Sequence, residues 1–595
     1  MMDTSRLGRL GDWLDERTGW RTAVRAWIDH PVVGGAPWAS AMAAAVATCF
    51  GVLALTGITL MTAYGASPQA AWASVHYVQF VQGGGWVVRG LHYWAAQSLF
   101  VLAALHVVHG AFAATYRRPR EVAWWLTLGI LGLAVAGGIT GGVLPWDERG
   151  WWARTVEGNI IGLAPGLGSF QQQMMQGGAE LGALGLSRML TIHVLLLPVL
   201  LGAMLWARRA MVRRHGWSET GGAPISHATQ IMRDVVVAAC VVAVVFALAA
   251  LAHGAPLEAP ADPMGDYPAR PEWFLMTLYE LRKGFHGAGE FFGTTLVPMA
   301  VGLYLALLPW LDQPGRSRAV VLTPVVLACA GALVLGWIPV HKDAHDEAFV
   351  RQRAKADRRA TAAAQLAMAG VPPEGALAMM RADPELRGRS LFDQHCASCH
   401  VLGDLGDAKK ATASKLDGWG TPAWISAMLH DPDAPEFFGG GPFARNMPSV
   451  DTRPKDKPVS APWKPMVTSD AERAAVAAFL ASEGDEPGDP PRPLDEATRA
   501  AGEKIVSGRC SNCHLYKGDG DVNGSDVAPE LAHYGSIAWT RAQVANPATV
   551  ETYREKALDE DLKKHMPRFD KDLTPADIDV VARWTRAHAR GLSVP

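Results

Sequence analysis

Cysteine is scarce in this chain, which has seven in 595 residues. Three of them stand singly in apolar runs and the other four form two CxxCH motifs, so none is left for a disulfide framework. Charged residues are also sparse at 19%, the formal net charge is −2, and no basic patch is interleaved with aromatic residues. The sequence therefore excludes a disulfide-stapled domain and predicts no nucleic-acid partner.

The start of the chain lacks the pattern of a signal peptide. Residues 5–28 are rich in Arg and Trp and have the spacing of an amphipathic helix, without a short apolar stretch and a small-residue cleavage site. We expect residues 1–37 to be retained and to place this helix on a membrane surface.

Long apolar runs dominate the first 340 residues, in a chain that is 49% hydrophobic. Arginine clusters follow the second, fourth and sixth runs, and the positive-inside rule places these loops and the amino terminus in the cytoplasm. An odd number of spans then leaves everything after residue 340 on the outer side. The seven runs, each long enough to cross a bilayer core of about 30 Å, are residues 38–63, 90–115, 123–143, 188–208, 233–253, 293–311 and 319–340.

The second run carries two histidines fourteen residues apart, His92 and His106. At about 100° and 1.5 Å per residue they return to nearly one face, roughly 21 Å apart. Neutral imidazole is a common haem ligand, and an ionisable side chain inside a membrane span indicates function. The fourth run has the same direction and offers His193 at the depth of His92, but Arg208 at the depth of His106. Histidines held only by hydrogen bonds within a bundle are the alternative.

Several segments occur in a fixed order: DWLDER, RGLHYW, ALHVVHG, YRRPREVAWW, GGVLPWDERGWWA and IHVLLLP. Through them, residues 10–217 resemble the four-helix cytochrome b of quinol-oxidising cytochrome bc complexes, especially the chloroplast and cyanobacterial form. Residues 255–340 resemble the three-helix carboxy-terminal part of that family, with its PEW motif at Pro271, Glu272 and Trp273. The two parts are separate chains in the chloroplast form and are fused here.

The resemblance implies a quinol site at the outer surface, beside a haem held by His92 and His193. Glu272 is expected to accept a quinol proton, assisted by the segment around Asp147, since quinol oxidation releases two protons near the membrane surface. Phe274 stands where the family usually has tyrosine.

Departures from the family gather on the cytoplasmic side. Arg208 replaces the fourth haem-ligating histidine, His109 stands where the chloroplast form has arginine, and Ala41 replaces the cysteine that binds an extra haem there. Arginine is a poor iron ligand but a good partner for haem propionates. Three outcomes remain open: a five-coordinate haem on His106, a haem shifted by one turn onto His109 and Met211, or no inner haem.

Two similar units follow a charged, alanine-rich stretch that suits a helical linker. Each has a helix leading into CxxCH, an internal Met-Pro and a terminal helix, the layout of class I cytochrome c, which both resemble. Two thiols on one turn bind the haem vinyls and the adjacent histidine binds iron, whereas zinc binding or a disulfide is the alternative. The predicted haem residues are Cys396, Cys399 and His400 in the first motif and Cys510, Cys513 and His514 in the second.

The distal ligand of each c haem should be a methionine before the terminal helix, because a thioether raises the reduction potential. Met566 fits this position in the second unit. Met447 is the choice in the first unit, with Met466 as its rival.

These patterns predict an all-α protein, a seven-span transmembrane bundle with a haem-binding four-helix core plus two small cytochrome c domains. The expected boundaries are a surface helix in 1–37, a four-helix domain in 38–217, a three-helix domain in 218–340, a linker in 341–383, and cytochrome c domains in 384–485 and 492–595.

The expected function is that of a fused subunit of a quinol:cytochrome c oxidoreductase in the bacterial inner membrane. It would hold two b haems, the inner one in an altered site, and two covalent c haems, with quinol as substrate. No Rieske motif of Cys and His pairs is present, so the iron-sulfur protein is expected as a separate partner. Membrane lipid, a soluble cytochrome c or terminal oxidase, and a second copy in a homodimer are the other expected partners. A non-bifurcating electron conduit or scaffold, and electron flow in reverse towards quinone, are the competing interpretations.

Overall fold

The structure is a computed structural model that describes residues 4–29, 31–32, 38, 41–217, 225–439, 447–452, 464–517, 528–549, 551–553 and 566–594. It divides into two compact units, residues 1–379 and 380–595. The regular secondary structure of the described residues is almost all helix, and their one sheet is the two-residue pair of β1 (Pro31–Val32) with β2 (Ile225–Ser226).

Seven helices in the first unit are long and apolar enough to cross a membrane, which confirms the predicted multi-pass bundle. The fourth is continuous through α9 (Ala183–Thr191), a π-helical turn η3 (Ile192–Leu196) and α10 (Leu197–His215), and the sixth includes the π-helical turn η6 (Phe292–Leu296). The other spans are α3 (Met42–Met61), α5 (Gly85–Phe112), α6 (Glu121–Gly142), α11 (His227–Leu251), α13 (Val297–Leu311) and α14 (Arg318–His345).

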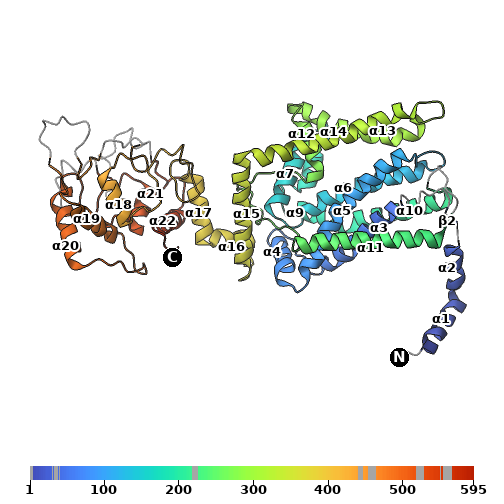
Figure 1. Ribbon diagram of the computed structural model, residues 1–595, viewed down its shortest axis with the longest axis horizontal. Coiled ribbons are helices and arrows are strands. Elements are labelled where there is room, and N and C mark those ends of the chain that lie inside the picture. Colours follow the sequence, from blue (N-terminus) through green and yellow to red (C-terminus); the bar gives the residue numbers. More distant parts are fainter. Residues whose placement is uncertain are drawn as a thin grey trace. The chain divides into compact units, whose positions relative to one another are not determined.

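The core of the first unit is a four-helix arrangement in which α5 packs on α3 and α6, and α10 packs on α6 (Figure 1). Helix α11 lies along α3 and α5. Small residues allow these close approaches, as membrane helices require. A Cβ on Gly90 of α5 would lie 2.9 Å from the Cβ of Ala249 on α11.

The amino-terminal amphipathic segment is two helices, α1 (Thr4–Thr18) and α2 (Trp20–Ile28), and not the single helix expected over residues 5–28. Gly19 between them has φ 62°, a left-handed conformation that interrupts the helix.

The segments between the spans contain further helices: α4 (Ala71–His76), α7 (Glu148–Gly162), α8 (Gly168–Gln176) and α12 (Met276–Arg282). Helix α15 (Glu347–Ala367), in the stretch expected as a linker, packs on α4 and α14 and belongs to the first unit. Arg359 of α15 lies 2.9 Å from the Glu148 carboxylate, and His76 hydrogen-bonds the carbonyl of Ala364 at 3.0 Å. Part of the predicted linker is therefore docked on the membrane unit.

The second unit begins at Met380, within the short helix α16 (Ala376–Ala382), and contains both CxxCH motifs. Its longer helices are α17 (Pro384–His395), α18 (Pro422–His430), α19 (Asp470–Glu483), α20 (Glu496–Gly508), α21 (Ile537–Ala545) and α22 (Pro575–Arg590). They pair in a way that the repeat pattern does not predict, because α17 packs on α22 and α19 packs on α20.

Candidate haem and quinol sites

The predicted outer histidine pair is brought together by the four-helix core. His92 of α5 and His193 of the π-helical turn η3 have ring centroids 6.2 Å apart, with planes inclined at 66°. π-helical turns are frequent at functional sites. A metal ion bonded to one nitrogen of each ring at about 2 Å requires a separation of this size.

Two threonines fix the tautomer of these histidines. Thr56 Oγ1 donates to the carbonyl of Val52 at 2.6 Å, and Thr140 Oγ1 donates to that of Ala136 at 2.8 Å. Each hydroxyl lies 3.0 Å from the Nδ1 of a histidine, Thr56 with His92 and Thr140 with His193. Because each hydroxyl already donates its one hydrogen to a carbonyl, its oxygen accepts a hydrogen bond from the Nδ1–H of the histidine. Nε2 of both rings is then left with a free lone pair.

Glycines make room for both rings. A Cβ on Gly141 of α6 would lie 2.6 Å from Cε1 of His193, and one on Gly57 of α3 would lie 3.2 Å from Cε1 of His92. Two neutral imidazoles with oriented lone pairs, held against side-chain-free helix surfaces, fit the bis-histidine ligation of a haem.

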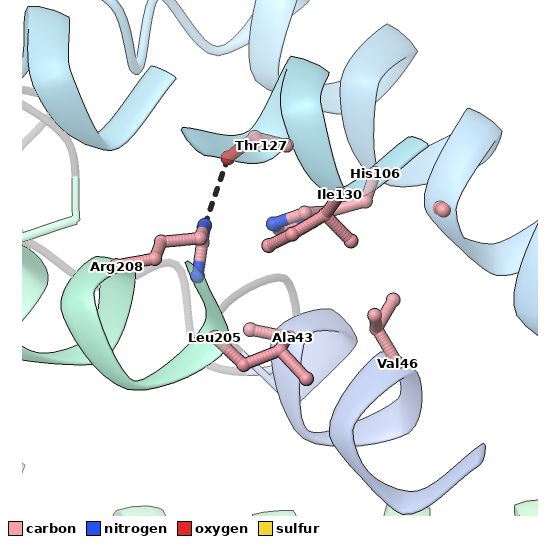
Figure 2. A pocket seen from close by; sticks show the side chains of 8 residues that line it. Ala43, Val46, His106, Thr127, Ile130, Leu205 and Arg208 are labelled. Carbon is pink, nitrogen blue, oxygen red and sulfur yellow. Dashed lines mark hydrogen bonds between the residues drawn. The ribbon is translucent and has the colours of Figure 1, made fainter. Parts of the chain in front are cut away.

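The inner site contains one histidine and one arginine. His106 is 5% exposed and neither ring nitrogen has a hydrogen-bond partner. Arg208 of α10 points into the same small cavity, of about 10 Å³, and its Nε donates to Thr127 Oγ1 at 2.8 Å (Figure 2). A buried imidazole without a partner is costly, and a metal bond would satisfy it. His106 therefore fits an iron ligand, whereas Arg208 offers no second one.

His109 lies outside this cavity. Its ring stacks on Trp217 at 5.1 Å with planes inclined at 21°, and neither His109 nor Met211 is among the residues that line the pocket of His106. A haem held by His109 and Met211 stays a prediction.

The PEW segment and the outer histidine pair contact α6 at adjacent residues. The neighbours Gly141 and Gly142 face two different groups: a Cβ on Gly141 would meet His193, and one on Gly142 would lie 3.6 Å from the Glu272 carboxylate. Glu272 Oε2 accepts a hydrogen bond from Arg149 Nη2 at 2.9 Å. The carboxylate of Glu272 and the ring of His193 thus approach α6 at the same depth, against neighbouring residues.

Aromatic contacts hold this segment in place. The rings of Phe274 and Phe100 are 4.8 Å apart, and a Cβ on Gly138 would lie 2.7 Å from Phe274. Trp273 Nε1 donates to Gln97 Oε1 at 2.6 Å. Pro271, the first residue of this segment, is partly buried.

Asp147 is buried, and its hydrogen bonds are to backbone N–H groups. It is 5% exposed, caps α7 by accepting from Gly150 N at 2.8 Å, and accepts from Glu258 N at 3.2 Å. Burial raises the pKa of Asp147 to about 6. The charged group that reaches Glu272 is Arg149, which sequence reasoning missed although it lies two residues beyond Asp147 in the quoted PWDER motif.

The histidines of both CxxCH motifs are also oriented. His400 Nδ1–H donates to the carbonyl of Ser414 at 2.9 Å, and His514 Nδ1–H donates to that of Pro529 at 2.8 Å. Burial lowers the pKa of both histidines, which favours neutral rings. Nε2 is therefore left for iron in each motif, beside the thiol pairs Cys396 with Cys399 and Cys510 with Cys513.

The candidate distal methionines lie in different surroundings. Met566 Sδ accepts a hydrogen bond from Gln543 Nε2 at 3.1 Å. Met447 and Met466 both pack against the hydrophobic core that also contacts Cys510.

Three family descriptions match successive parts of the chain. "Cytochrome b(N-terminal)/b6/petB" matches residues 97–263, "Cytochrome c" matches residues 386–483, and "Cytochrome C oxidase, cbb3-type, subunit III" matches residues 497–584.

Several curated proteins are similar to the membrane part. The menaquinol:cytochrome c reductase cytochrome b subunit of Geobacillus thermodenitrificans is 34% identical over 221 residues, 36% of this chain and 98% of the relative. Cytochrome b6 of Chlamydomonas reinhardtii is 32% identical over 171 residues, 29% and 80% of the two chains. The cytochrome bc complex cytochrome b subunit of Chlorobaculum thiosulfatiphilum is 29% identical over 308 residues, 49% and 70% of the two chains. This chain belongs to the cytochrome b family of the bc-type complexes, and it carries two c-type cytochrome domains on the same polypeptide.

Proposed function

We propose that the chain is the fused cytochrome b and dihaem cytochrome c subunit of a quinol:cytochrome c oxidoreductase, oxidising quinol at the outer membrane face. One observation supports this proposal above the others: His193 and Glu272 lie against two adjacent glycines of α6, Gly141 and Gly142. Proton acceptance and electron acceptance from one substrate require such neighbours.

The chain's own groups have distinct tasks at this site. Glu272 accepts the proton of a quinol hydroxyl, and Arg149 orients the carboxylate through its hydrogen bond. Phe274 and Phe100 present apolar ring surface to the quinol ring. Haem bound by His92 and His193 supplies one-electron transfer, and a separate Rieske protein takes the other electron.

The c-type domains carry that second electron onward. His400 and His514 are oriented for iron, and the four cysteines bind the haems covalently. A soluble cytochrome c or a terminal oxidase is the proposed acceptor. The membrane is the bacterial inner membrane, with the amino terminus in the cytoplasm, the c domains outside, lipid around the seven spans and the complex a homodimer.

The inner haem is proposed to bind His106 with Arg208 beside a propionate. Arg208 is buried and one bond to Thr127 uses only its Nε, so its other nitrogens are suited to a carboxylate. This site would let electrons cross towards the cytoplasmic face.

A non-bifurcating conduit is the second candidate, because the inner site has one imidazole where the outer site has two. Pyridine haemochrome analysis of the purified subunit decides between them. Two b haems per two c haems supports the cross-membrane chain, and quinol added with the Rieske partner should then reduce b and c haems together. One b haem per two c haems would replace bifurcated oxidation with the conduit. Reduction of quinone by the c haems instead would establish the reverse direction.

A further inference from the structure

The two cytochrome c repeats are interlocked. If each repeat folded independently, its leading and terminal amphipathic helices would bury their apolar faces against each other. In the described residues, the leading helix α17 of the first repeat packs on the terminal helix α22 of the second. The leading helix α20 of the second repeat packs on the terminal helix α19 of the first. No comparable packing joins α17 to α19 or α20 to α22 in this part of the chain.

Matching glycines build both helix crossings. Gly388 and Gly502 each stand eight residues before the first cysteine of their motif. A Cβ on Gly388 would lie 2.3 Å from the Cβ of Trp584 on α22, and one on Gly502 would lie 2.5 Å from the Cβ of Phe479 on α19. The same close contact therefore occurs twice, each time between different repeats.

Polar contacts support the first crossing. Arg387 Nη2 donates to Asp577 Oδ1 at 2.8 Å, and Trp584 Nε1 donates to Glu385 Oε1 at 3.0 Å. Phe392 of α17 lies 5.5 Å from the ring of Trp584. These partners are about 190 residues apart in sequence, so the contacts join the first repeat to the second.

The chain crosses over at two equivalent turns. Trp419 Nε1 donates to Tyr534 Oη at 3.0 Å. Each aromatic is followed by a glycine with φ 75°, Gly420 or Gly535. Thr421 and Ser536 then cap α18 and α21. The two turns lie side by side, and each repeat passes there from one core to the other.

The exchange produces two hydrophobic cores of mixed origin. One contains Leu391, Phe392, Leu402 and Leu405 of the first repeat with Trp539, Val544, Ile578, Val581 and Trp584 of the second. The other contains Ile425, Val476, Phe479 and Leu480 of the first repeat with Ile505, Val506, Tyr516 and Leu531 of the second.

Each CxxCH motif consequently shares a core with the methionine segment of the other repeat. Cys396 and Phe569 pack on the first core, and His395 lies 5.9 Å from the ring of Phe569, three residues after Met566. Cys510, Met447 and Met466 pack on the second core. The preceding Arg509 donates from Nη1 to the carbonyl of Met466 at 2.8 Å.

We propose that the two c haems take their distal ligands across the repeats. The haem attached at Cys396 and Cys399, with His400 as proximal ligand, is ligated by Met566. The haem attached at Cys510 and Cys513, with His514 as proximal ligand, is ligated by Met447 or Met466. This pairing depends on haem attachment at CxxCH and is independent of quinol oxidation.

The test uses the full chain with only one c haem. In the Cys510→Ala, Cys513→Ala background, haem remains at Cys396 and Cys399. Met566→Ala should abolish the long-wavelength absorption band of methionine-ligated ferric haem and lower the reduction potential, because the thioether ligand is lost. The Met447→Ala, Met466→Ala double variant is the matched control and should retain the band. The opposite result would overturn the proposal.

The reciprocal background, Cys396→Ala with Cys399→Ala, should reverse the two outcomes. A second measurement covers the case in which the one-haem chains fail to fold. A protease site inserted into residues 485–494, between α19 and α20, is cut in the intact holoprotein in membranes. Interlocked repeats should keep the haem-bearing carboxy-terminal fragment on the membrane, whereas its release as a soluble haem protein would show that the repeats are independent.

Discussion

Arg149 and Glu272, 123 residues apart in sequence, are joined by a hydrogen bond of 2.9 Å between Nη2 and Oε2. The arginine comes from the helix that follows α6, and the carboxylate comes from the PEW turn before η4 (Trp273–Leu275). The proposed proton acceptor is thus held by a cation from the other half of the cytochrome b fold.

Glu272→Gln should lower quinol oxidation by about 10²-fold, because a general base contributes on this order. Arg149→Gln should lower it less, since the carboxylate remains but loses the hydrogen bond that orients it. Steady-state quinol:cytochrome c reduction measures both. Glu180 is exposed, so Glu180→Gln is the control. A wild-type rate of quinol oxidation in Glu272→Gln would show that Glu272 does not accept the proton.

Arg208→His should place a second imidazole opposite His106. We expect one b-haem EPR signal to change from high-spin to low-spin, with the haem content maintained or increased. The neighbouring Arg209 is exposed, so Arg209→His is the matched control. If neither variant alters the EPR spectrum, His106 does not bind iron.

Gly141→Ala should remove or distort the outer b haem, because the added Cβ would lie 2.6 Å from His193. Gly137→Ala, on the same helix with no atom within 4 Å of its added Cβ, should leave both b haems in place. Pyridine haemochrome ratios of the two variants provide the measurement. An equal ratio in both would show that His193 needs no space at position 141.

Thr140→Val should weaken the basicity of His193 by removing the acceptor for its Nδ1–H, which raises the reduction potential of the outer haem. Potentiometric titration of the b haems tests this. Thr59 of α3 donates only to its own helix, to the carbonyl of Leu55, so Thr59→Val should leave the potentials unchanged. A shift common to both variants would indicate a general effect of losing a hydroxyl.

Burial raises the pKa of Glu148 to about 7, with Arg359 opposing the shift. Because this pKa lies above the ordinary value of a glutamate, its contribution to stability is complete below about pH 4.3 and is lost as the pH rises through 7. Glu148→Gln should therefore gain stability relative to wild type between pH 5 and 8, by at most about 3 kcal/mol. Thermal unfolding in detergent across this range measures the difference, and parallel pH profiles would contradict it.

The membrane fold was largely predictable because length and apolar composition determine the spans. The pairing of His92 with His193 followed from helical periodicity and span direction. Arg149 was missed because its partner is distant in sequence, and the break at Gly19 was missed because an isolated glycine is tolerated within a helical pattern.

The interlocked repeats were beyond sequence reasoning for another reason. Both repeats have the same order of helices and the same glycine before CxxCH, so α17 has equally suitable partners in α19 and α22. Apolar patterns specify which face of a helix is buried, but not which of two similar helices covers it.

Docking of α15 by Arg359 and His76 fixes the point from which the chain leaves the membrane unit. The chain stays on that unit beyond α15: a Cβ on Gly375 would lie 3.0 Å from Cα of Gln69, and the first compact unit ends only at Met379. A free stretch over all of residues 341–383 would reach about 150 Å. Most of the stretch predicted as a linker is instead fixed to the membrane unit, so it cannot supply the reach of a flexible tether.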